Sequence, residues 1–374
     1  MWALAHNLNP ILIAKLRESF QLTDSKAILV DSAFYIAYFF MALPSVSLIS
    51  RFGYQKTIML GLLLFALGTL GFVLASARHS YEFFLCALLL IGCGITILEA
   101  AANPLITRIS DPSEQVFRLN FAQSFNGLGA IVATGLGGYL LLSNTTEVSS
   151  SGILPFLVLA CIILALMLLI GQLKFPQLQV VQSPNSGFNF SIFRNKVFLF
   201  AVVAQFLYVG AQIGVSSFFI RYLSLYHSVG SQDSAYYLSM SLALFTSGRF
   251  LGSWLMKRWR AERILLFFSI GAVLSTICIV LAHPFSFYFL LVLPFFMSIM
   301  FPTIFALGIS ALPWDKEQGG AIIVMTISGG ALIPFCMAQF SQWCGKLSWA
   351  YALPVFCFVA VGIFAFYYKH LKHD

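Results

Sequence analysis

The sequence has very little charge. Only 9% of its 374 residues are Asp, Glu, Lys or Arg, whereas 60% are hydrophobic. A soluble globular domain carries about 25% charged residues, so this composition excludes an ordinary soluble domain and indicates an integral membrane protein. The net charge of +8 does not indicate nucleic-acid binding, because the Lys and Arg residues lie in short loops between apolar segments, as the positive-inside rule expects.

The sequence also lacks the motifs of enzymes and of metal sites. No HExxH, GxSxG or CxxC occurs, and no glycine-rich patch forms a GxxxxGK[ST] phosphate loop. The seven cysteines lie in or at the ends of apolar segments, which is typical of small buried hydrophobic residues rather than of a disulfide framework. We therefore expect no catalytic activity, no metal and no cofactor.

Long apolar segments are what the sequence has in abundance. They fall roughly at 1–16, 27–50, 57–77, 81–107, 119–142, 153–173, 197–223, 234–256, 263–283, 286–311, 320–344 and 348–368. Helices of about 20 apolar residues cross a bilayer, so the fold class is expected to be an all-α membrane protein of about twelve helices. The first segment has only about fifteen residues, too few to cross at 1.5 Å per residue, so its helix is expected to be truncated at the N-terminus.

One polar break divides these segments six and six. It covers 174–196, and its Pro, Ser, Asn and Gly residues are typical of a linker. We expect a six-helix bundle at 1–173 and another at 197–374. The two halves repeat weakly, since SRFGYQK at 50–56 and KRWRAER at 257–263 occupy the same place in each half, and Pro104 matches Pro302. Parallel repeats of this kind are typical of secondary transporters, whose substrate sites lie near the bilayer midplane.

The basic residues of the loops predict the orientation. One set of alternate loops, together with the C-terminal tail, holds more than twice as many Lys and Arg residues as the opposite set. The richer side is expected to be cytoplasmic. Both termini are then cytoplasmic, and the expected location is a bacterial inner membrane.

One carboxylate lies deep inside an apolar segment. Glu99, in ILEAAANPL, is the only charge between about Phe83 and Ile106. A charged acid near the bilayer centre costs about 2.5–3.5 kcal/mol on insertion scales and is functional by default. Such a group is expected to hold a proton and to release it when water reaches the site, which suits a proton relay. The alternative is a protonated Glu that only bonds to a neighbouring helix.

Uncharged amides follow in the next segment. Gln123 and Asn126 are three residues apart and share one helix face. Amides carry both donors and acceptors, which a polyhydroxylated substrate needs, although they also join helices in membranes. Asn7 and Asn9 in the first segment, with His6 beside them, favour a hydrophilic cavity.

Two other charged residues lie within apolar segments. Asp31 follows Lys26 by about five residues and is expected to be an interfacial acid near the outer mouth. Arg249 precedes the basic cluster that begins at Lys257 by about two turns. We expect Arg249 to snorkel or to pair near the inner gate rather than to bind substrate.

Several stretches resemble one family of membrane transporters, the fucose–galactose–hexose symporters of the major facilitator superfamily, and specifically the L-fucose:proton symporter type. The resemblance is carried by ALAHNLNPIL, SAFYIAYF, LEAAANP, RLNFAQSFNGLGAI, AQFLYVGAQ, FIRY, GRFLGSWL, FPTIFALGI and VMTISGG. It covers nearly the whole chain. It implies a twelve-helix major facilitator fold, alternating access and a central sugar cavity lined mainly by the first half.

The resemblance also implies roles for particular residues. The acid of the LEAAANP motif carries coupling protons in the family, and here it is Glu99. The family's cavity amides correspond to Asn7, Gln123 and Asn126. This chain departs from the family at Pro10, where the fucose symporter type has a second proton-handling Asp. Three alternatives follow: Glu99 couples alone, Asp31 or His6 shares the work, or the chain uses another ion or none.

The sequence as a whole predicts a secondary transporter that imports a monosaccharide, L-fucose or a related hexose, by proton symport. The loops around Gly53-Tyr54 and Trp259-Arg260 are expected to lie at the inner gate. The expected partners are the sugar, the proton and the lipid bilayer, with no nucleic acid, and a monomer is implied by the resemblance. The alternatives are a sodium-coupled or uncoupled hexose carrier, a membrane sensor that has lost transport and, weakest for want of catalytic groups, an intramembrane enzyme.

Overall fold

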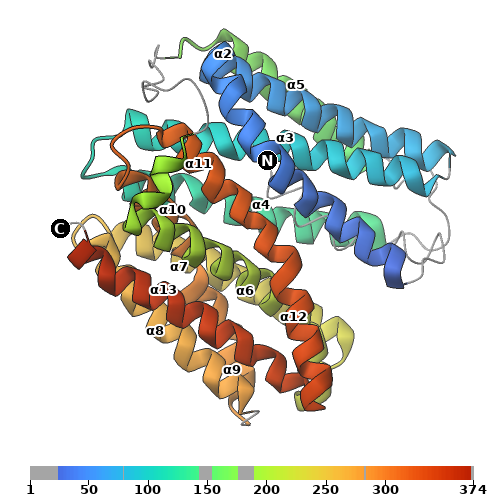
Figure 1. The fold of residues 1–374 in the computed structure, drawn as a ribbon. Coiled ribbons are helices and arrows are strands. Elements are labelled where there is room, and N and C mark those ends of the chain that lie inside the picture. Colours follow the sequence, from blue (N-terminus) through green and yellow to red (C-terminus); the bar gives the residue numbers. More distant parts are fainter. Residues whose placement is uncertain (1–23, 79, 143–153, 176–188, 282–283, 372–374) are drawn as a thin grey trace. The chain divides into compact units, whose positions relative to one another are not determined.

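The computed structural model describes residues 24–78, 80–142, 154–175, 189–281 and 284–371. Within these ranges the regular structure is entirely helical (Figure 1). Helices are what a membrane demands, because a helix satisfies its backbone hydrogen bonds internally where water is absent. Every apolar segment expected from residue 27 onward coincides with helical structure, whereas the segment at 1–16 lies outside the described residues.

The helices follow one another with short connections. The first six longer helices are α2 (Asp24–Arg78), α3 (Tyr81–Ile109), α4 (Gln115–Leu142), α5 (Leu154–Gln172), α6 (Lys196–His227) and α7 (Ser231–Leu255). The others are α8 (Ala261–Val280), α9 (Ser286–Met297), α10 (Met300–Ser310), α11 (Lys316–Met325), α12 (Gly329–Cys344) and α13 (Ala352–Leu371). Short 3₁₀ turns lie at η2 (Phe190–Arg194), η3 (Thr326–Ser328) and η4 (Leu347–Tyr351). Among the described residues, seven helical segments are long and apolar enough to cross a membrane.

The longest helix contains a break at one glycine. The apolar part of α2, Phe34–Ala75, has 42 residues, about 63 Å of helix or roughly twice the thickness of a bilayer core. Gly53 interrupts it with φ of 75° and ψ of 171°, a conformation that a residue with a Cβ atom rarely adopts. The break therefore separates α2 into the two spans that the sequence predicts at 27–50 and 57–77.

Two of the later spans are discontinuous, which the sequence analysis did not anticipate. The span expected at 286–311 consists of α9 and α10, with Ser298 and Ile299 as non-helical residues between them. The span expected at 320–344 consists of α11 and α12, joined by the 3₁₀ turn η3. Discontinuous membrane helices leave backbone groups available for other partners, and they are common at the substrate and ion sites of transporters.

The described chain forms two compact units. The first contains α2, α3 up to Leu105, α4 from Leu128, α5 and the stretch Gly320–Met325. The second contains the stretch Ile106–Gly127, η2, α6 to α10, α11 up to Gly319, and the helices from Thr326 onward. The two bundles expected at 1–173 and 197–374, with their linker at 174–196, remain a prediction.

The first unit is held together by close contact between α2 and α3. A Cβ atom on Gly94 would lie 2.6 Å from the Phe65 nitrogen and 2.7 Å from the Gly61 carbonyl oxygen. The two backbones can approach this closely only because both positions are glycine, the usual device for packing membrane helices. The phenyl ring of Phe65 is fully buried beside this contact.

Gly94→Ala is expected to lower the free energy of unfolding by about 1–3 kcal/mol, the usual cost of overpacking. The new methyl group would collide with backbone atoms that cannot move without separating the helices. Thermal unfolding in detergent would measure the loss. Gly230→Ala is the matched control, because a Cβ there meets no atom within 4 Å; equal melting temperatures for the two variants would contradict this account of the packing.

The second unit contains a helical layer in which α13 packs against both α8 and α6 (Figure 1). On the other side of α6 lie α10 and α12. Three tyrosines are fully buried there, and their hydroxyl groups reach main-chain oxygens: Tyr208 donates to Met297, Tyr222 to Ile279 and Tyr351 to Val215. These hydrogen bonds satisfy polar atoms that would otherwise be costly to bury.

Candidate functional site

Glu99 is the buried carboxyl group of the first unit. It lies on α3 with 7% of its surface exposed, and its Oε1 atom accepts a hydrogen bond from the Tyr38 hydroxyl of α2 at 3.2 Å. Asn103, one turn further along the same face of α3, is also buried. The carboxyl is therefore enclosed by polar groups from two helices.

The position of Tyr38 depends on a glycine two turns before Glu99. A Cβ atom on Gly92 would lie 2.7 Å from the Ala37 Cβ and 3.1 Å from the Phe34 carbonyl oxygen. Gly92 thus lets the first part of α2 lie directly against α3. The ring of Tyr38 is also held by an edge contact with Phe34, at 5.5 Å between ring centroids. The tyrosine hydroxyl is fixed on the carboxyl by packing rather than by chance of rotamer.

A second polar cluster lies in the second unit, along α4. Asn126 Nδ2 lies 3.4 Å from the Gln123 side-chain oxygen. Asn120, one turn before Gln123, donates to the Thr303 hydroxyl of α10 at 3.1 Å. The two amides predicted from the sequence do lie together, and they continue a polar face that includes Asn120, which the sequence analysis did not single out.

The break between α9 and α10 provides this cluster with free carbonyl groups. Pro302 has no backbone N–H, so it cannot donate to the carbonyl of Ser298, four residues earlier. Ser298 is fully buried, and an unpaired carbonyl there would be costly. The Arg249 side chain supplies the missing donor, since its Nε lies 2.6 Å from the Ser298 oxygen.

Arg249 also binds α4. Its Nη1 donates to the Gln123 carbonyl oxygen at 2.9 Å, and its guanidinium carbon lies 4.5 Å from the centre of the Phe245 ring. Only 4% of the residue is exposed. No carboxylate of the described residues lies within ion-pair distance of it. Arg249 is thus a buried cation whose partners are two main-chain oxygens and one aromatic face.

This geometry corrects the expectation for Arg249. The sequence predicted an arginine that snorkels or pairs near the inner gate, but the side chain points into the protein and joins α7 to α4 and to the helix break. The signal that could have found it is present in the sequence. A charged residue within an apolar segment is functional by default, and the rule applied to Glu99 applies equally to GRFLGSWL.

Some hydrogen-bonding capacity in the second unit has no partner among the described residues. The Asn126 side-chain oxygen is one such atom, and both polar atoms of the Gln205 side chain on α6 are others. Gln205 is fully buried, one turn before Tyr208. Buried amides seldom stay unpaired, so these atoms are available to a polar ligand or to ordered water.

The remaining predicted residues fall in several places. Tyr54 is buried after the break at Gly53, while Trp259 and Arg260 are exposed between α7 and α8. Arg260 pairs with Glu262, the Arg260 Nε lying 2.6 Å from a carboxylate oxygen. Asp31 lies within α2. His6, Asn7 and Pro10 lie outside the described residues.

A buried ion pair joins the ends of α3 and α11. Arg108 Nη1 lies 2.9 Å from Glu317 Oε1, with 14% of the arginine side chain and 2% of the glutamate side chain exposed. Removing one partner of a buried pair leaves the other charge uncompensated, which costs more than the pair itself contributes. The Arg108–Glu317 ion pair therefore fixes the start of α11 against the end of α3.

Glu317→Gln is expected to lower the free energy of unfolding by about 2 kcal/mol, somewhat less than for a fully buried pair because Arg108 is partly hydrated. The double variant Arg108→Glu, Glu317→Arg should recover part of the loss. Arg118→Gln is the control, since the Arg118–Glu114 pair is exposed and worth little. Thermal unfolding in detergent measures all three, and a Glu317→Gln variant as stable as the native chain would exclude this role.

The architecture defines a class of protein. A multi-pass helical membrane protein with discontinuous helices, a buried acid and a buried arginine has the construction of a secondary transporter. Residues 2–334 match the Major Facilitator Superfamily.

The relatives narrow this class. The L-fucose-proton symporter of Escherichia coli (strain K12) is 35% identical over 395 aligned residues, covering 98% of this chain and 90% of the relative. A glucose/galactose transporter of Brucella abortus biovar 1 (strain 9-941) is 31% identical over 376 residues, covering 97% of this chain and 90% of the relative. The chain belongs to the Major Facilitator Superfamily and, within it, to the fucose–galactose–hexose symporter family that the sequence motifs predicted.

A solved structure agrees with this assignment. The crystal structure of FucP, a Major Facilitator Superfamily transporter in the outward conformation, matches with a TM-score of 0.89 and 35% identity, covering 98% of this chain and 95% of that one. The predicted all-α major facilitator fold is therefore confirmed. The family is one of transporters rather than enzymes, and the chain is a multi-pass membrane protein.

Proposed function

We propose that this protein imports a monosaccharide, L-fucose or a related hexose, together with a proton across a bacterial inner membrane by alternating access. The observation that carries the proposal is the enclosed carboxyl of Glu99, held by the Tyr38 hydroxyl inside a membrane helix. The names of the relatives, a fucose-proton symporter and a glucose/galactose transporter, support the choice of substrate and coupling ion. Both termini are placed in the cytoplasm by the loop charges, and the protein is proposed to act as a monomer.

In this mechanism Glu99 is the proton carrier. A carboxyl in an apolar helix accepts a proton from the outer water when the site opens outward and gives it up when the site is wetted from inside. The protonated side chain carries no charge, so the conformational change need not move a buried anion through an apolar environment. Asp31 and His6 are proposed only as further candidates for proton handling.

The amides are proposed to bind the sugar. A hexose presents hydroxyl groups that both donate and accept hydrogen bonds, and an amide matches both. The unpartnered side-chain oxygen of Asn126 can accept from a hydroxyl group, and Gln123 lies beside it on α4. Asn7 is proposed to add to this set. Gly53, Tyr54, Trp259 and Arg260 are proposed to lie at the inner gate.

Asn126→Ala is expected to raise the sugar concentration for half-maximal uptake by about tenfold, as the loss of one or two hydrogen bonds of about 1 kcal/mol each would do. The maximal rate with a saturating sugar concentration should change much less. Initial rates of radiolabelled uptake over a range of sugar concentrations would measure both. Gln342→Ala removes an exposed amide on α12 and is the control; an unchanged half-saturation in Asn126→Ala would remove Asn126 from the site.

The experiment that tests the proposed function uses purified protein in proteoliposomes. Uptake of radiolabelled L-fucose, D-galactose, D-glucose and D-mannose is measured with and without an inward proton gradient. Accumulation of at least one sugar above its equilibrium level, only with the gradient, is the expected result. Accumulation that needs a sodium gradient instead, or equilibration without accumulation, would replace the proton by sodium or by no coupling ion. No uptake of any hexose would contradict the proposed substrate class.

A further inference from the structure

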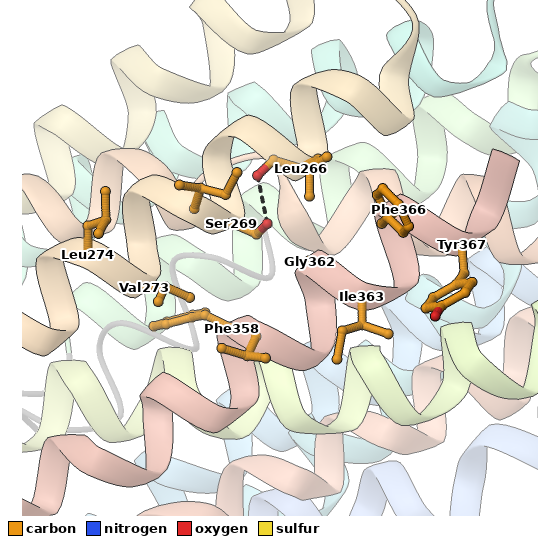
Figure 2. Close-up of a pocket in the computed structure, with 11 residues that line it drawn as sticks. Leu266, Ser269, Val273, Leu274, Phe358, Gly362, Ile363, Phe366 and Tyr367 are labelled. Carbon is orange, nitrogen blue, oxygen red and sulfur yellow. Dashed lines mark hydrogen bonds between the residues drawn. The ribbon is translucent and has the colours of Figure 1, made fainter.

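A groove runs between α8 and α13 in the second unit (Figure 2). Its volume is about 340 Å³, and it extends from Leu274 at one end to Tyr367 at the other. The side chains that line its walls are apolar, and many of them are exposed. They include Leu266, Ile270 and Leu274 from α8, and Phe358, Ile363 and Phe366 from α13. The groove therefore suits a long apolar ligand rather than a sugar, whose hydroxyl groups would find no partners there.

The floor of the groove is deep because one residue has no side chain. A Cβ atom on Gly362 would come within 2.9 Å of the Ser269 hydroxyl oxygen and 3.9 Å of Leu266 Cδ1. The Ser269 hydroxyl already donates to the Leu266 carbonyl at 2.7 Å, as the dashed line in Figure 2 marks. The one hydroxyl on the floor is thus satisfied within its own helix, and the floor behaves as an apolar surface.

The two helices place a cation at one end of this groove. Arg263 is exposed and lies one turn before Leu266, on the same face of α8 as Leu266 and Ile270. Within the described residues Arg263 makes no ion pair, whereas the nearby Arg260 is paired with Glu262. The groove therefore leads to an unpaired guanidinium group.

We propose that this groove binds one anionic phospholipid, with an acyl chain along the apolar walls and the phosphate group on Arg263. Charge complementarity supports this occupant, because a basic residue beside an anionic membrane surface contributes about 1 kcal/mol and a guanidinium binds phosphate bidentately. Arg263 begins α8 on the side proposed as cytoplasmic, where anionic lipids concentrate. Tyr367, half exposed at the same end, is the kind of residue found at membrane interfaces. The inference does not depend on the transported substrate.

Native mass spectrometry of the full chain in detergent tests the proposal. Dioleoyl phosphatidylglycerol and dioleoyl phosphatidylcholine serve as probes, because they share acyl chains and differ in headgroup charge. The native chain should retain one phosphatidylglycerol under collisional activation that removes phosphatidylcholine. Arg263→Gln should reduce retention of phosphatidylglycerol about fivefold, the ratio that corresponds to about 1 kcal/mol.

A second variant separates the groove from the general lipid surface. Ile270→Trp would fill the groove and should reduce retention of phosphatidylglycerol, and Ile363→Trp on the facing helix replaces it if it cannot be purified. Phe267→Trp, on an exposed residue of α8 that does not line the groove, should retain lipid as the native chain does. Equal retention of the two lipids, or unchanged retention of phosphatidylglycerol in Arg263→Gln or in the groove-filling variant, would overturn the proposal. So would a native dimer that the groove-filling variant dissociates.

Discussion

Replacing Glu99 by glutamine is expected to abolish sugar accumulation driven by a proton gradient, while exchange of labelled for unlabelled sugar continues. Glutamine keeps the size of the side chain and an oxygen that can accept the Tyr38 hydroxyl bond seen in the native chain. It remains neutral at every pH, so it resembles the protonated acid but cannot release a proton. The variant should therefore complete the steps that need a neutral residue 99 and fail at the step that discharges it.

Glu82→Gln is the matched control for this prediction. Glu82 lies on the same helix as Glu99, but it is exposed near the start of α3, where its side chain accepts a bond from the Ser80 hydroxyl. Its loss should leave accumulation unchanged. Both variants are compared with the native chain in proteoliposomes for gradient-driven uptake and for exchange. A Glu99→Gln protein that accumulates sugar as the native protein does would remove Glu99 from the coupling mechanism.

Arg249→Met is expected to reduce transport by at least about 100-fold. The substitution removes the donors of two hydrogen bonds, to the Ser298 and Gln123 carbonyl oxygens, and hydrogen bonds from a charged group contribute about 1.5–3 kcal/mol each. The break between α9 and α10 would then contain a buried carbonyl without a donor, because Pro302 cannot supply one. Because Arg249 connects this break to the backbone of Gln123, we expect sugar affinity to fall along with the rate.

Two further variants show whether geometry or charge matters at Arg249. Arg249→Lys keeps the charge, but a lysine ammonium cannot reproduce the planar arrangement of guanidinium donors, so its activity should fall between those of the native chain and Arg249→Met. Arg258→Met removes an exposed arginine whose guanidinium lies over the Trp254 ring and should transport normally. The measurements are initial uptake rates and sugar affinity, with thermal unfolding as a check that each variant is folded. Native transport by a folded Arg249→Met protein would contradict the assigned role.

Much of the fold could be predicted from the sequence because hydrophobicity in a membrane protein is nearly a direct record of helix position. Each apolar segment from 27–50 onward coincides with helical structure. Glu99 could be predicted for the same reason, since a single acid in an apolar stretch has few neutral explanations. Gln123 and Asn126 were found from helical spacing alone, which places residues three apart on one face.

The helix break could not be predicted from its proline. Pro44 and Pro104 lie inside the helices α2 and α3, whereas Pro302 follows the interruption between α9 and α10. The difference depends on whether a distant side chain accepts the freed carbonyl group as a partner. For Ser298 that side chain is Arg249, 49 residues earlier in the chain, and no local pattern records this pairing.

Arg249 was misjudged for a related reason. Its distance from Lys257 along the helix predicts its depth correctly enough to suggest snorkelling, but depth does not say in which direction a long side chain points. That direction is set by three partners on other turns and other helices: Phe245, the Gln123 carbonyl and the Ser298 carbonyl. Only the folded structure brings these together.

The central claim, that a sugar and a proton move together through this protein, is tested most directly by following the proton when the sugar is added. Proteoliposomes containing a trapped pH-sensitive dye, with no gradient imposed, receive an external pulse of the sugar that the uptake assay identifies. The account predicts acidification of the interior that requires the sugar, disappears in Glu99→Gln and persists in Glu82→Gln. Sugar entry in the native protein without any change in internal pH would contradict proton symport.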